Sequence, residues 1–324
     1  MILVVVEHDR GTIAAAALEA LTAGARLASD RDDVVEALTI GASADALADQ
    51  LATYGAAAVH QAHHDLLSDY GPEAWGEVVA QAAVTLRPTT VIATGTDRGN
   101  EVLAHAAARL DQPMVANCIE FTDGDVFHVT RVRWGGSLLE EAAVDASPVL
   151  FTVAHHAIEA QPADSPGAAE PRPFEPDLDP SLARSVVAER VERVAGITLS
   201  TAPVVVGGGR GVGSAEGFAS LQELADLLGG VVGCSRAVTN NGWRNHTDQV
   251  GQTGTRIAPD IYFACGISGA IQHWVGAMAS KNILAINTDP NANMVTKAGY
   301  AVIGDLHEVV PAISAEIRRR RGLS

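Results

Sequence analysis

The last third of the chain repeats one pattern, a short apolar run that ends in a cluster of Gly, Ser, Thr, Asn or Asp. Between Val204 and Leu306 the runs and loops read VVVGGGRGVGSAEGF, VGCSRAVTNNGW, DQVGQTG, ACGISGAIQH, AINTDPNAN and VIGD. Strand-length runs that stop at such clusters and lead into helices predict a parallel α/β sheet. Its loops gather at the carboxyl edge, where backbone N–H groups and helix N-termini favour phosphates. The pattern therefore predicts a nucleotide-type ligand.

Four segments of this region carry a more specific signal. They read SRA at 235–237, VGQTG at 250–254, GISGAIQH at 266–273 and AINTDP at 285–290. Their order and spacing closely resemble the FAD-binding domain of the electron transfer flavoprotein alpha subunit family. The resemblance is dense over the last third of the chain and thinner before it. It implies a C-terminal domain that binds FAD, and an N-terminal domain that has lost nucleotide binding and serves subunit contact.

Alternating strands and helices also occupy the first third of the chain. The β-branched run at 2–7 fits a buried strand, and the Ala-rich segment 11–27 has helical spacing. Pro72 stands near the start of a helix that reaches Leu86, where a proline is well tolerated. Alternation of this kind predicts a second parallel sheet. Further strands are predicted at 34–40, 57–60 and 90–94, and further helices at 42–51 and 101–110.

The texture changes after residue 110. Short strands joined by Gly and Asp turns, among them Asp123-Gly124, predict a more antiparallel edge for the first domain. Residues 160–180 are rich in Pro, Ala, Asp and Glu and have little periodic apolar content, which predicts a connector. Residues 185–194 fit either a short strand or a short helix. The strands of the antiparallel edge are predicted at 115–121, 126–134 and 148–153.

We therefore expect an α/β protein with two domains. A chain of 324 residues with 47% hydrophobic content can bury ample core, and its length suggests about two domains. The first is predicted to be a Rossmann-like α/β domain over 1–158. A linker region follows over 159–199, and the C-terminal parallel-sheet FAD-binding domain covers 200–324.

The chain is strongly acidic. Its formal net charge is -17, and of its 22 Lys and Arg residues only Lys281 and Lys297 are lysines. Such a surface disfavours nucleic acids and anionic membranes as partners, because both require basic patches. The acidity fits a protein kept soluble in high salt, although a GC-rich genome would also replace Lys with Arg. Both explanations stay open.

Nothing in the sequence predicts a membrane span or a secretory signal. No apolar run approaches the ~20 residues that cross a bilayer, and MILVVVEHDR lacks a basic segment before its apolar run. We expect a soluble, cytoplasmic protein. Cys118, Cys234 and Cys265 lie in or beside apolar stretches without CxxC spacing, so buried, reduced thiols are expected.

The first half offers two weaker candidate sites. Imidazoles at short spacing are common zinc ligands, but no HExxH or Cys partner accompanies them here, so no metal is expected. The GTDRGN loop at 95–100 could hold a phosphate after its strand, although the family resemblance argues against nucleotide binding in this domain. The histidines concerned are His60, His63, His64, His155 and His156.

The glycine loop at 207–213 lacks the GxGxxG spacing of the dinucleotide fingerprint, although it follows a predicted strand at 204–206 and precedes a predicted helix at 215–228. This mismatch weakens a standard dehydrogenase interpretation. A glycine loop that carries Arg210 suits close backbone approach to an anion, with the guanidinium as a fixed positive partner. The alternative is a tight turn with a solvated arginine.

Three residues match positions that tune the flavin in the family. Reduced flavin gains negative charge on its N1 and O2 side, so a nearby cation or donor raises its potential. By resemblance, Arg236 lies against the isoalloxazine ring, Thr253 faces flavin N5, and His273 lies near the pyrimidine carbonyl. Taken singly, they would more often be a surface arginine, a turn threonine and a helix-surface histidine.

The remaining expected contacts follow from the same loops. Ser268, Gly269 and Ala270 are predicted to open a helix that ends near residue 279, so that their N–H groups meet the pyrophosphate. Asn287 and Asp305 end predicted strands at 283–286 and 301–304 and suit the adenosine half of FAD. Further positions that match family flavin contacts, or stand beside one, are Ser235, Val250, Gly251, Gln252, Ile271, Gln272 and Leu306.

The resemblance implies an electron carrier rather than a substrate-converting enzyme. The alpha subunit would hold FAD in a heterodimer with a beta subunit, accept electrons from flavin dehydrogenases such as the acyl-CoA dehydrogenases of fatty acid β-oxidation, and pass them to a quinone oxidoreductase. The absence of a nucleophile–base pair or of paired acids agrees with chemistry that belongs to the cofactor.

Three alternatives stay open. An electron-bifurcating complex would carry a second flavin in the beta subunit. A stand-alone oxidoreductase would use NAD or FAD in the same fold and would need a pocket for a hydride-accepting substrate. A flavin-free relative would only bind a partner.

Overall fold

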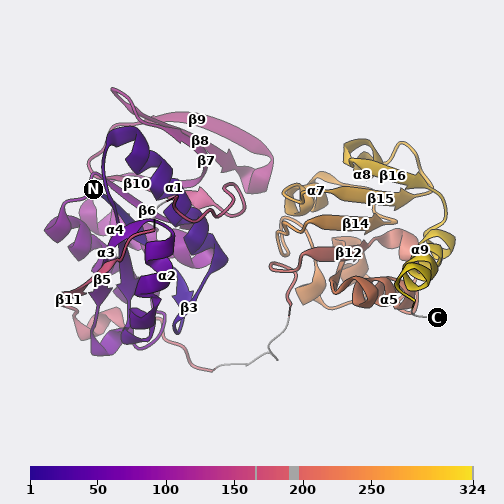
Figure 1. The fold of residues 1–324 in the computed structure, drawn as a ribbon, viewed down its shortest axis with the longest axis horizontal. Coiled ribbons are helices and arrows are strands. Elements are labelled where there is room, and N and C mark those ends of the chain that lie inside the picture. The colour runs from indigo at the N-terminus through magenta and orange to yellow at the C-terminus, as the bar shows by residue number, and fades with distance from the viewer. Residues whose placement is uncertain (165, 190–196, 323–324) are drawn as a thin grey trace. The chain divides into compact units, whose positions relative to one another are not determined.

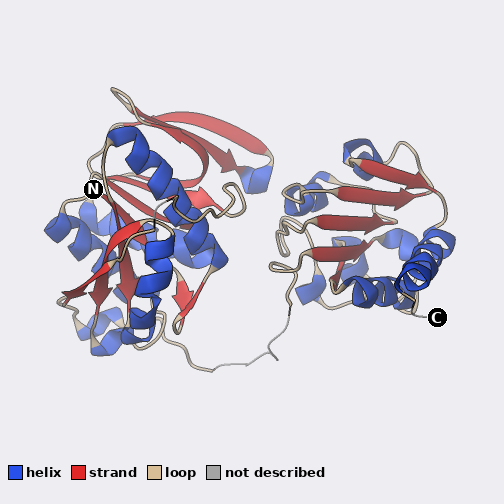
Figure 2. Ribbon diagram, viewed as in Figure 1, coloured by secondary structure: helices blue, strands red, loops and turns tan. Residues whose placement is uncertain are grey.

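The computed structural model describes residues 1–164, 166–189 and 197–322, and its contacts form two compact units. The larger unit comprises Met1–Trp134 and Leu138–Glu192, and the smaller one is built from Arg193–Ser324 (Figure 1). Each unit contains its own sheet with helices against it (Figure 2). The expected α/β architecture with two domains is therefore confirmed.

The larger unit is organised around a nine-stranded sheet of order β11-β5-β4-β1-β6-β10-β7-β8-β9. The strands from β11 to β7 run parallel, whereas β7, β8 and β9 pair antiparallel, as the sequence predicted for this edge. The strands are β1 (Ile2–Val5), β4 (Val35–Ile40), β5 (Ala56–Ala62), β6 (Thr90–Gly95), β7 (Met114–Thr122), β8 (Phe127–Arg133), β9 (Leu138–Val144), β10 (Val149–Ala154) and β11 (Glu170–Phe174), with a separate hairpin of β2 (His8–Asp9) and β3 (Thr12–Ile13).

Helices cover both faces of this sheet, because successive side chains of its central strands alternate between two cores. Ile2 and Val4 of β1 pack into the core that contains α1 and α2, and Leu3 and Val5 pack into the core of α3 and α4. Both faces of β1 are thus buried, which explains its uninterrupted apolar sequence. The helices are α1 (Ala15–Arg31), α2 (Ala48–Thr53), α3 (Pro72–Leu86) and α4 (Asp97–Leu110).

Several helix starts differ from prediction: the helix predicted at 11–27 is α1 at Ala15–Arg31, and the helix predicted at 215–228 is α5 at Phe218–Leu228. The segment predicted as one helix at 42–51 is a 3-10 turn, Ala42–Leu47, followed by α2. Helix α4 begins inside the GTDRGN segment, at Asp97, because the Thr96 hydroxyl caps it by accepting the N–H of Gly99 at 3.0 Å. This segment is therefore mainly the first turn of a helix and not a loop.

The connector predicted at 160–180 contains a strand that the sequence did not reveal. Strand β11 pairs in parallel with β5, and Arg172 on β11 donates to Glu36 of β4 at 2.9 Å. The two prolines of β11 hid it, because proline is tolerated in a sheet only at an edge, which is where β11 lies. Of the ambiguous segment 185–194, residues 185–189 form neither helix nor strand, and the rest lies outside the described residues.

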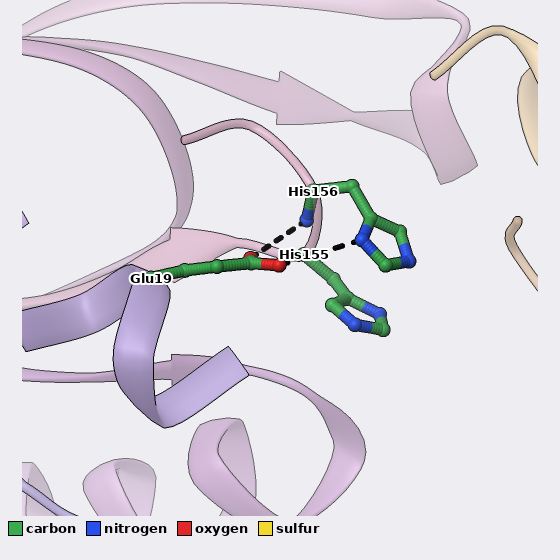
Figure 3. Close-up of side chains that lie close together, drawn as sticks. All are labelled: Glu19, His155 and His156. Atoms are coloured by element: carbon green, nitrogen blue, oxygen red, sulfur yellow. Dashed lines mark hydrogen bonds and ion pairs between the residues drawn. The ribbon is translucent and has the colours of Figure 1, made fainter. Parts of the chain in front are cut away.

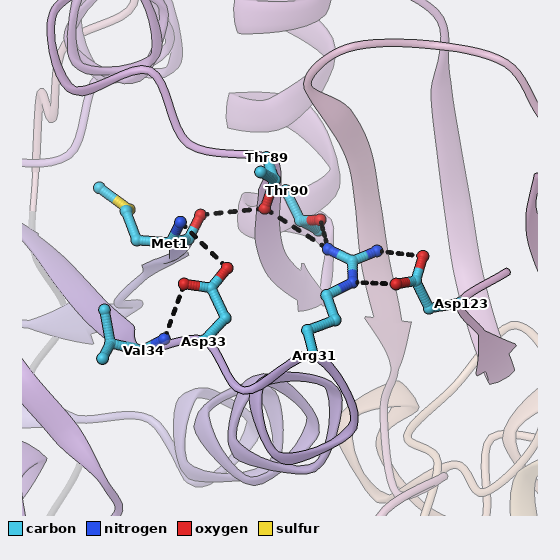
Figure 4. Close-up of polar contacts among 7 residues, drawn as sticks. All are labelled: Met1, Arg31, Asp33, Val34, Thr89, Thr90 and Asp123. Carbon is cyan, nitrogen blue, oxygen red and sulfur yellow. Dashed lines mark hydrogen bonds and ion pairs between the residues drawn. The ribbon is translucent and has the colours of Figure 1, made fainter. Parts of the chain in front are cut away.

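A polar cluster ties the end of α1 to the turn between β7 and β8 (Figure 4). Arg31 donates two hydrogen bonds to the carboxylate of Asp123, at 2.6 and 2.8 Å, and one to Thr90 at 2.8 Å. The Met1 amino group forms an ion pair with Asp33 at 3.0 Å. The predicted Asp123-Gly124 turn is thereby fixed against the parallel part of the sheet.

The smaller unit has a five-stranded parallel sheet of order β13-β12-β14-β15-β16. Chain order reverses at β12, whose neighbours are β13 on one side and β14 on the other, and ligands bind outside the strand ends at such a point. The strands are β12 (Val204–Gly208), β13 (Val231–Cys234), β14 (Ile261–Cys265), β15 (Ile283–Asn287) and β16 (Tyr300–Ile303). The helices are α5 (Phe218–Leu228), α6 (Arg236–Asn240), α7 (Ile271–Ala277), α8 (Asn293–Lys297) and α9 (Leu306–Arg321).

Cys118, Cys234 and Cys265 are buried free thiols, as expected. Burial raises the pKa of each thiol to about 12, so none is a thiolate at neutral pH. None of the helices within the described ranges has the length and apolar character needed to cross a membrane.

Candidate functional site

The loops after β12 and β14 meet backbone to backbone at the carboxyl edge of the smaller sheet. Gly209 donates its N–H to Cys265 O at 2.8 Å, and Gly211 donates to Gly266 O at 3.1 Å. A Cβ added to Gly209 would lie 2.1 Å from Gly266 O, and Gly266 itself has a φ of 61°. The glycine loop is therefore required by close packing. Arg210 lies directly on this contact.

A cleft of about 540 Å³ opens beside these loops, and a second cavity of about 230 Å³ adjoins it through the shared residues Gly266 and Ser268. The larger volume lies within the range of about 300–1,000 Å³ typical of small-molecule sites. Most of the predicted site residues line one or both: Arg210, Ser235, Arg236, Ser268, Gly269, Ala270, Gln272 and His273 in the cleft, and Ser268, Asn287, Asp305 and Leu306 in the cavity.

Arg210 and Arg236 supply positive charge to the cleft. Both are exposed, and neither guanidinium has an ion-pair or hydrogen-bond partner within the described parts of the chain. In a chain of net charge -17, two unpaired guanidiniums on one cleft attract an anionic ligand. Arg236 begins α6 directly after the buried Ser235, so the backbone fixes where its side chain starts.

The predicted loop with Val250, Gly251, Gln252 and Thr253 borders the cleft without lining either cavity, and so does Ile271. Val250 donates its N–H to Cys234 O at 2.9 Å, and Gln252 donates to Gln272 O at 2.7 Å. These bonds fix the loop between the end of β13 and the start of α7. Its residues therefore neighbour cleft-lining residues on both sides.

His273 is buried, with 6% exposure, and not a helix-surface residue. Its Nε2 lies 2.8 Å from the hydroxyl of Tyr262, a fully buried residue of β14. Burial lowers the pKa of His273 to about 4, so the imidazole is neutral at neutral pH. Its Nδ1 has no well-formed hydrogen bond to any described residue. His273 can thus act as a neutral hydrogen-bonding group at the cleft.

Helix α7 runs from Ile271 to Ala277, so Ser268, Gly269 and Ala270 precede it and do not form its first turn. Gly269 has a φ of 77°, and a Cβ there would lie 2.3 Å from Met294 N, which again requires glycine. The backbone N–H groups of this segment therefore border the cleft through a turn.

Asn287 and Asp305 also shape their own loops. Asn287 donates its side-chain amide to Ile267 O at 3.0 Å and accepts the N–H of Asp289 at 3.1 Å. Asp305 caps α9 by accepting the N–H of His307 at 2.9 Å. Each side chain keeps free acceptor capacity toward the cavity that it lines.

Several residues of the site were missed from sequence. Ala237 and Asn240 of α6 line the cleft. Gln249 and Tyr262 are buried behind it and bond to Thr253 and His273, respectively. The role of Tyr262 depends on a contact between β14 and α7 that no local pattern reveals.

Glu19, His155 and His156 bring possible metal-ligand atoms within 4.8 Å of one another in the larger unit (Figure 3). The two imidazoles stack with centroids 3.6 Å apart and planes 23° apart. Lone pairs of nearly parallel rings run side by side and do not converge on one ion. The Glu19 carboxylate accepts the backbone N–H of His156 at 2.8 Å. This arrangement favours a hydrogen-bonded carboxylate over metal chelation.

At the carboxyl edge of the larger sheet, polar side chains hydrogen-bond to one another. Glu7, just after β1, accepts hydrogen bonds from the hydroxyls of Thr94, at 2.5 Å, and of Thr96, the cap of α4. Each of the two cavities near this edge holds only about 10 Å³. A carboxylate at the helix start repels the phosphate that this position could otherwise attract. The phosphate alternative for residues 95–100 therefore gains no support.

Models of two protein domains match successive parts of this chain. Residues 2–178 match the model of the electron transfer flavoprotein domain, and residues 198–278 match that of the electron transfer flavoprotein FAD-binding domain. The second model is described as FAD-binding, so FAD is the cofactor of the smaller unit, which also carries the open cleft. Its unpaired guanidiniums, glycine cradle and paired cavities fit an elongated, anionic dinucleotide.

Several relatives match over nearly the whole of this chain. An electron transfer flavoprotein subunit alpha of Mycobacterium leprae is 37% identical over 99% of both chains, and that of Thermoanaerobacterium thermosaccharolyticum is 33% identical over 97% of this chain and 96% of the relative. Protein FixB of Clostridium saccharobutylicum is 35% identical over 96% and 94%, respectively. On both the domain models and the full-length relatives, the chain belongs to the electron transfer flavoprotein alpha subunit family.

Proposed function

We propose that this chain is the FAD-binding subunit of a heterodimeric electron carrier, in which a beta subunit closes the site. FAD supplies the redox chemistry when it is bound. The carrier would take electrons from flavin dehydrogenases, such as the acyl-CoA dehydrogenases of fatty acid β-oxidation, and deliver them to a quinone oxidoreductase in the cytoplasmic compartment. The observation that carries the proposal is the open cleft, with unpaired Arg210 and Arg236, inside the domain matched as FAD-binding.

The chain's own residues would bind and orient the cofactor. In this proposal the isoalloxazine ring lies in the larger cleft against Arg236, whose guanidinium stabilises the negative charge of the reduced ring. Arg210 and the turn of Ser268, Gly269 and Ala270 face the pyrophosphate. Asn287 and Asp305 lie against the adenosine half, in the adjoining cavity. Thr253 faces flavin N5, and neutral His273 faces the pyrimidine side.

The test is the cofactor content of the purified heterodimer. Coexpression with the beta subunit, followed by denaturation, should release one FAD per heterodimer, and Arg236→Ala should lower the FAD midpoint potential. A matched Arg318→Ala change removes an equal charge from α9, outside the cleft, and should leave the potential unchanged. A heterodimer that binds no flavin would return the chain to a partner-binding role, and NADH oxidation by the isolated chain would favour a stand-alone oxidoreductase.

A second candidate is an electron-bifurcating complex. Its support is the similarity to proteins from clostridia, among them Protein FixB of Clostridium saccharobutylicum and the subunit alpha of Clostridium acetobutylicum, the latter 32% identical over 96% of this chain. Two FAD per heterodimer in the same assay would favour this candidate over the simple carrier.

A further inference from the structure

Three polar side chains form a hydrogen-bonded chain beside the cleft. The Thr239 hydroxyl donates to Gln249 Oε1 at 2.8 Å, and Gln249 Nε2 donates to the Thr253 hydroxyl at 2.9 Å. Gln249 is only 1% exposed, so its amide depends on these two partners and not on water. Thr239 belongs to α6, which also carries the cleft-lining Arg236.

The direction of these bonds decides what Thr253 can offer. A hydroxyl has one proton to donate and two lone pairs to accept with. When Gln249 donates to Thr253, the Thr253 proton is left over and can point toward the cleft. Thr253 is then a hydrogen-bond donor to whatever it faces.

The same three side chains can also carry the opposite direction. The terminal torsion of a glutamine is broad and roughly two-fold, so the amide can exchange its oxygen and nitrogen by turning. Nε2 would then donate to the Thr239 hydroxyl, whose proton has a second acceptor, Arg236 O, at 3.0 Å. Thr253 would donate to Gln249 Oε1 and present only lone pairs to the cleft. Gln249 Oε1 and Nε2 each have a threonine partner in either arrangement.

We propose that Gln249 is a positioning residue that sets the hydrogen-bond direction of Thr253, and that its amide turns so that Thr253 can either donate to or accept from the flavin. This inference rests on the proposed function, in which Thr253 faces flavin N5. That nitrogen accepts a hydrogen bond in oxidised flavin and carries a proton in fully reduced flavin. A reversible chain lets one hydroxyl serve both states without an unpaired group in either.

Two substitutions lock the chain in opposite directions. In Gln249→Glu the ionised carboxylate only accepts, so Thr253 must donate inward; because burial raises the pKa of a carboxyl, the measurement is made above the pH at which the variant's FAD affinity stops changing. In Thr239→Val, turning the amide would bury an unpaired N–H opposite a methyl group, which is less tolerated than an unpaired C=O. Thr253 then stays a donor toward the cleft, and no charge is introduced.

The measurement is the affinity of the FAD-free heterodimer for oxidised FAD and, without oxygen, for dithionite-reduced FAD. The new charge of Gln249→Glu also changes FAD affinity directly, so the same substitution is made in a Thr253→Val background. The fold-change in affinity with the Thr253 hydroxyl, divided by the fold-change without it, gives the part that depends on the hydrogen-bond direction of Thr253. We expect a ratio of about tenfold against oxidised FAD and close to one for reduced FAD. This difference raises the two-electron midpoint potential by about 30 mV.

Thr239→Val should give the opposite result, with several-fold weaker binding of reduced FAD and unchanged binding of oxidised FAD. A purely structural role for the three residues would weaken both forms alike, which would overturn the proposal. A ratio near one for both forms would show that Gln249 does not set the direction. Tighter binding of reduced FAD by the Gln249→Glu protein, in the same ratio, would show that the native chain has one fixed direction, and would overturn the turning amide.

The experiment distinguishes an error in the placement of Thr253 at flavin N5 from an error in the proposed role of Gln249. If Thr253→Val by itself changes neither affinity, Thr253 does not face N5, and both that placement and the proposed role of Gln249 are wrong. If Thr253→Val changes an FAD affinity and the double-mutant ratio is still one, only the proposed role of Gln249 is wrong. Thermal unfolding of each variant, and its FAD content per heterodimer, confirm that the protein compared is folded.

Discussion

The carboxyl edges of the two sheets have similar backbones and opposite chemistry. Both sheets are parallel at their centre, with a first strand flanked on both sides and loops at the strand ends. In the larger unit Glu7 occupies the start of α4 by bonding to Thr94 and Thr96, and the cavities nearby hold about 10 Å³. In the smaller unit the equivalent edge leaves Arg210 and Arg236 unpaired around a cleft of about 540 Å³.

This difference shows that the fold provides a place for a ligand and the side chains decide whether the place is available. The glycines at 209 and 211 let two loops close against each other and leave room above them, whereas a carboxylate fills the corresponding place in the larger unit. One type of sheet edge can therefore be open to a ligand in one domain and stabilise the fold in the other.

The largest expected effect comes from closing the open edge. In Gly209→Ala the new Cβ would lie 2.1 Å from Gly266 O and 2.7 Å from Ile267 Cα, both backbone atoms that cannot turn away. We expect a loss of about 3 kcal/mol or more in the unfolding free energy of the smaller unit, together with loss of FAD binding. Urea unfolding and flavin content measure both. Gly299→Ala, where no atom lies within 4 Å of the added Cβ, is the matched control. Equal effects at both glycines would contradict the requirement for glycine at 209 that follows from its close packing against the loop after β14.

The next effect is a pH dependence that originates at the open edge. Burial lowers the pKa of His273 from 6.5 to about 4, so the unfolded chain binds its proton at a higher pH than the folded chain does. The stability from a neutral His273 is complete above about pH 6.5 and is lost as the pH falls toward about 4, for a total of about 3 kcal/mol.

Urea unfolding at pH 7 and pH 5 measures this dependence. The wild type should lose about 2 kcal/mol more than His273→Gln over that interval. His307→Gln, on the exposed first turn of α9, should keep the full wild-type slope. An unchanged slope in His273→Gln would mean that the imidazole is not held neutral by burial.

A smaller effect follows from removing charge from the open edge alone. Arg236→Ala should weaken FAD binding about 10- to 30-fold, because an exposed arginine should contribute toward the lower end, about 1.5–2 kcal/mol, of the range for a hydrogen bond to a charged group. Arg210→Ala should have an effect of the same sign. Isothermal titration of the FAD-free heterodimer measures both. Arg318→Ala changes the net charge equally from outside the cleft, and a comparable loss in that variant would indicate a long-range effect of charge instead of a local one.

The open edge was easier to predict from sequence than the closed one. Glycines and small polar residues at strand ends mark where a backbone must approach a neighbour or a ligand, so the loops at 235–237, 250–254 and 266–273 could be located before the fold was known. Arg210 was predicted from its glycine loop and Arg236 from the family resemblance, and both line the cleft. Most strands, and α3 with its end at Leu86, also follow from local sequence signals.

Long-range contacts account for what the sequence did not show. Strand β11 contains two prolines and three charged or aromatic residues and has no apolar alternation, so only its pairing with β5 defines it. Glu7 accepts hydrogen bonds from Thr94 and Thr96, which lie 87 and 89 residues further along the chain. His273 on α7 is buried and bonds to Tyr262 of β14. Each of these facts is set by which elements pack together, which no window of local sequence contains.

A modest effect is expected at the closed edge. Glu7→Gln keeps one oxygen that can accept from Thr94 or Thr96 but loses the charge, so the unfolding free energy of the larger unit should fall by about 1 kcal/mol. Neither the wild type nor the variant should bind AMP at this edge, because the space is too small even without the carboxylate. Calorimetric titration checks this. Binding of AMP by the variant would mean that charge, and not space, separates the two edges.

The smallest effect separates the charge of the open edge from that of the whole chain. The Debye length falls from about 10 Å at 0.1 M salt to about 3 Å at 1 M. Molar NaCl should therefore screen the repulsion within a chain of charge -17 and raise its melting temperature by a few degrees. The same salt should weaken FAD binding about two- to fivefold, because it screens the attraction of Arg210 and Arg236 for the phosphates. Opposite signs are the expected result, measured by thermal unfolding and by FAD titration at both salt concentrations. A melting temperature that does not respond to salt would count against adaptation of the acidic surface to high salt. An FAD affinity that rises with salt would show that the acidic surface, and not the two guanidiniums, dominates the field at the open edge.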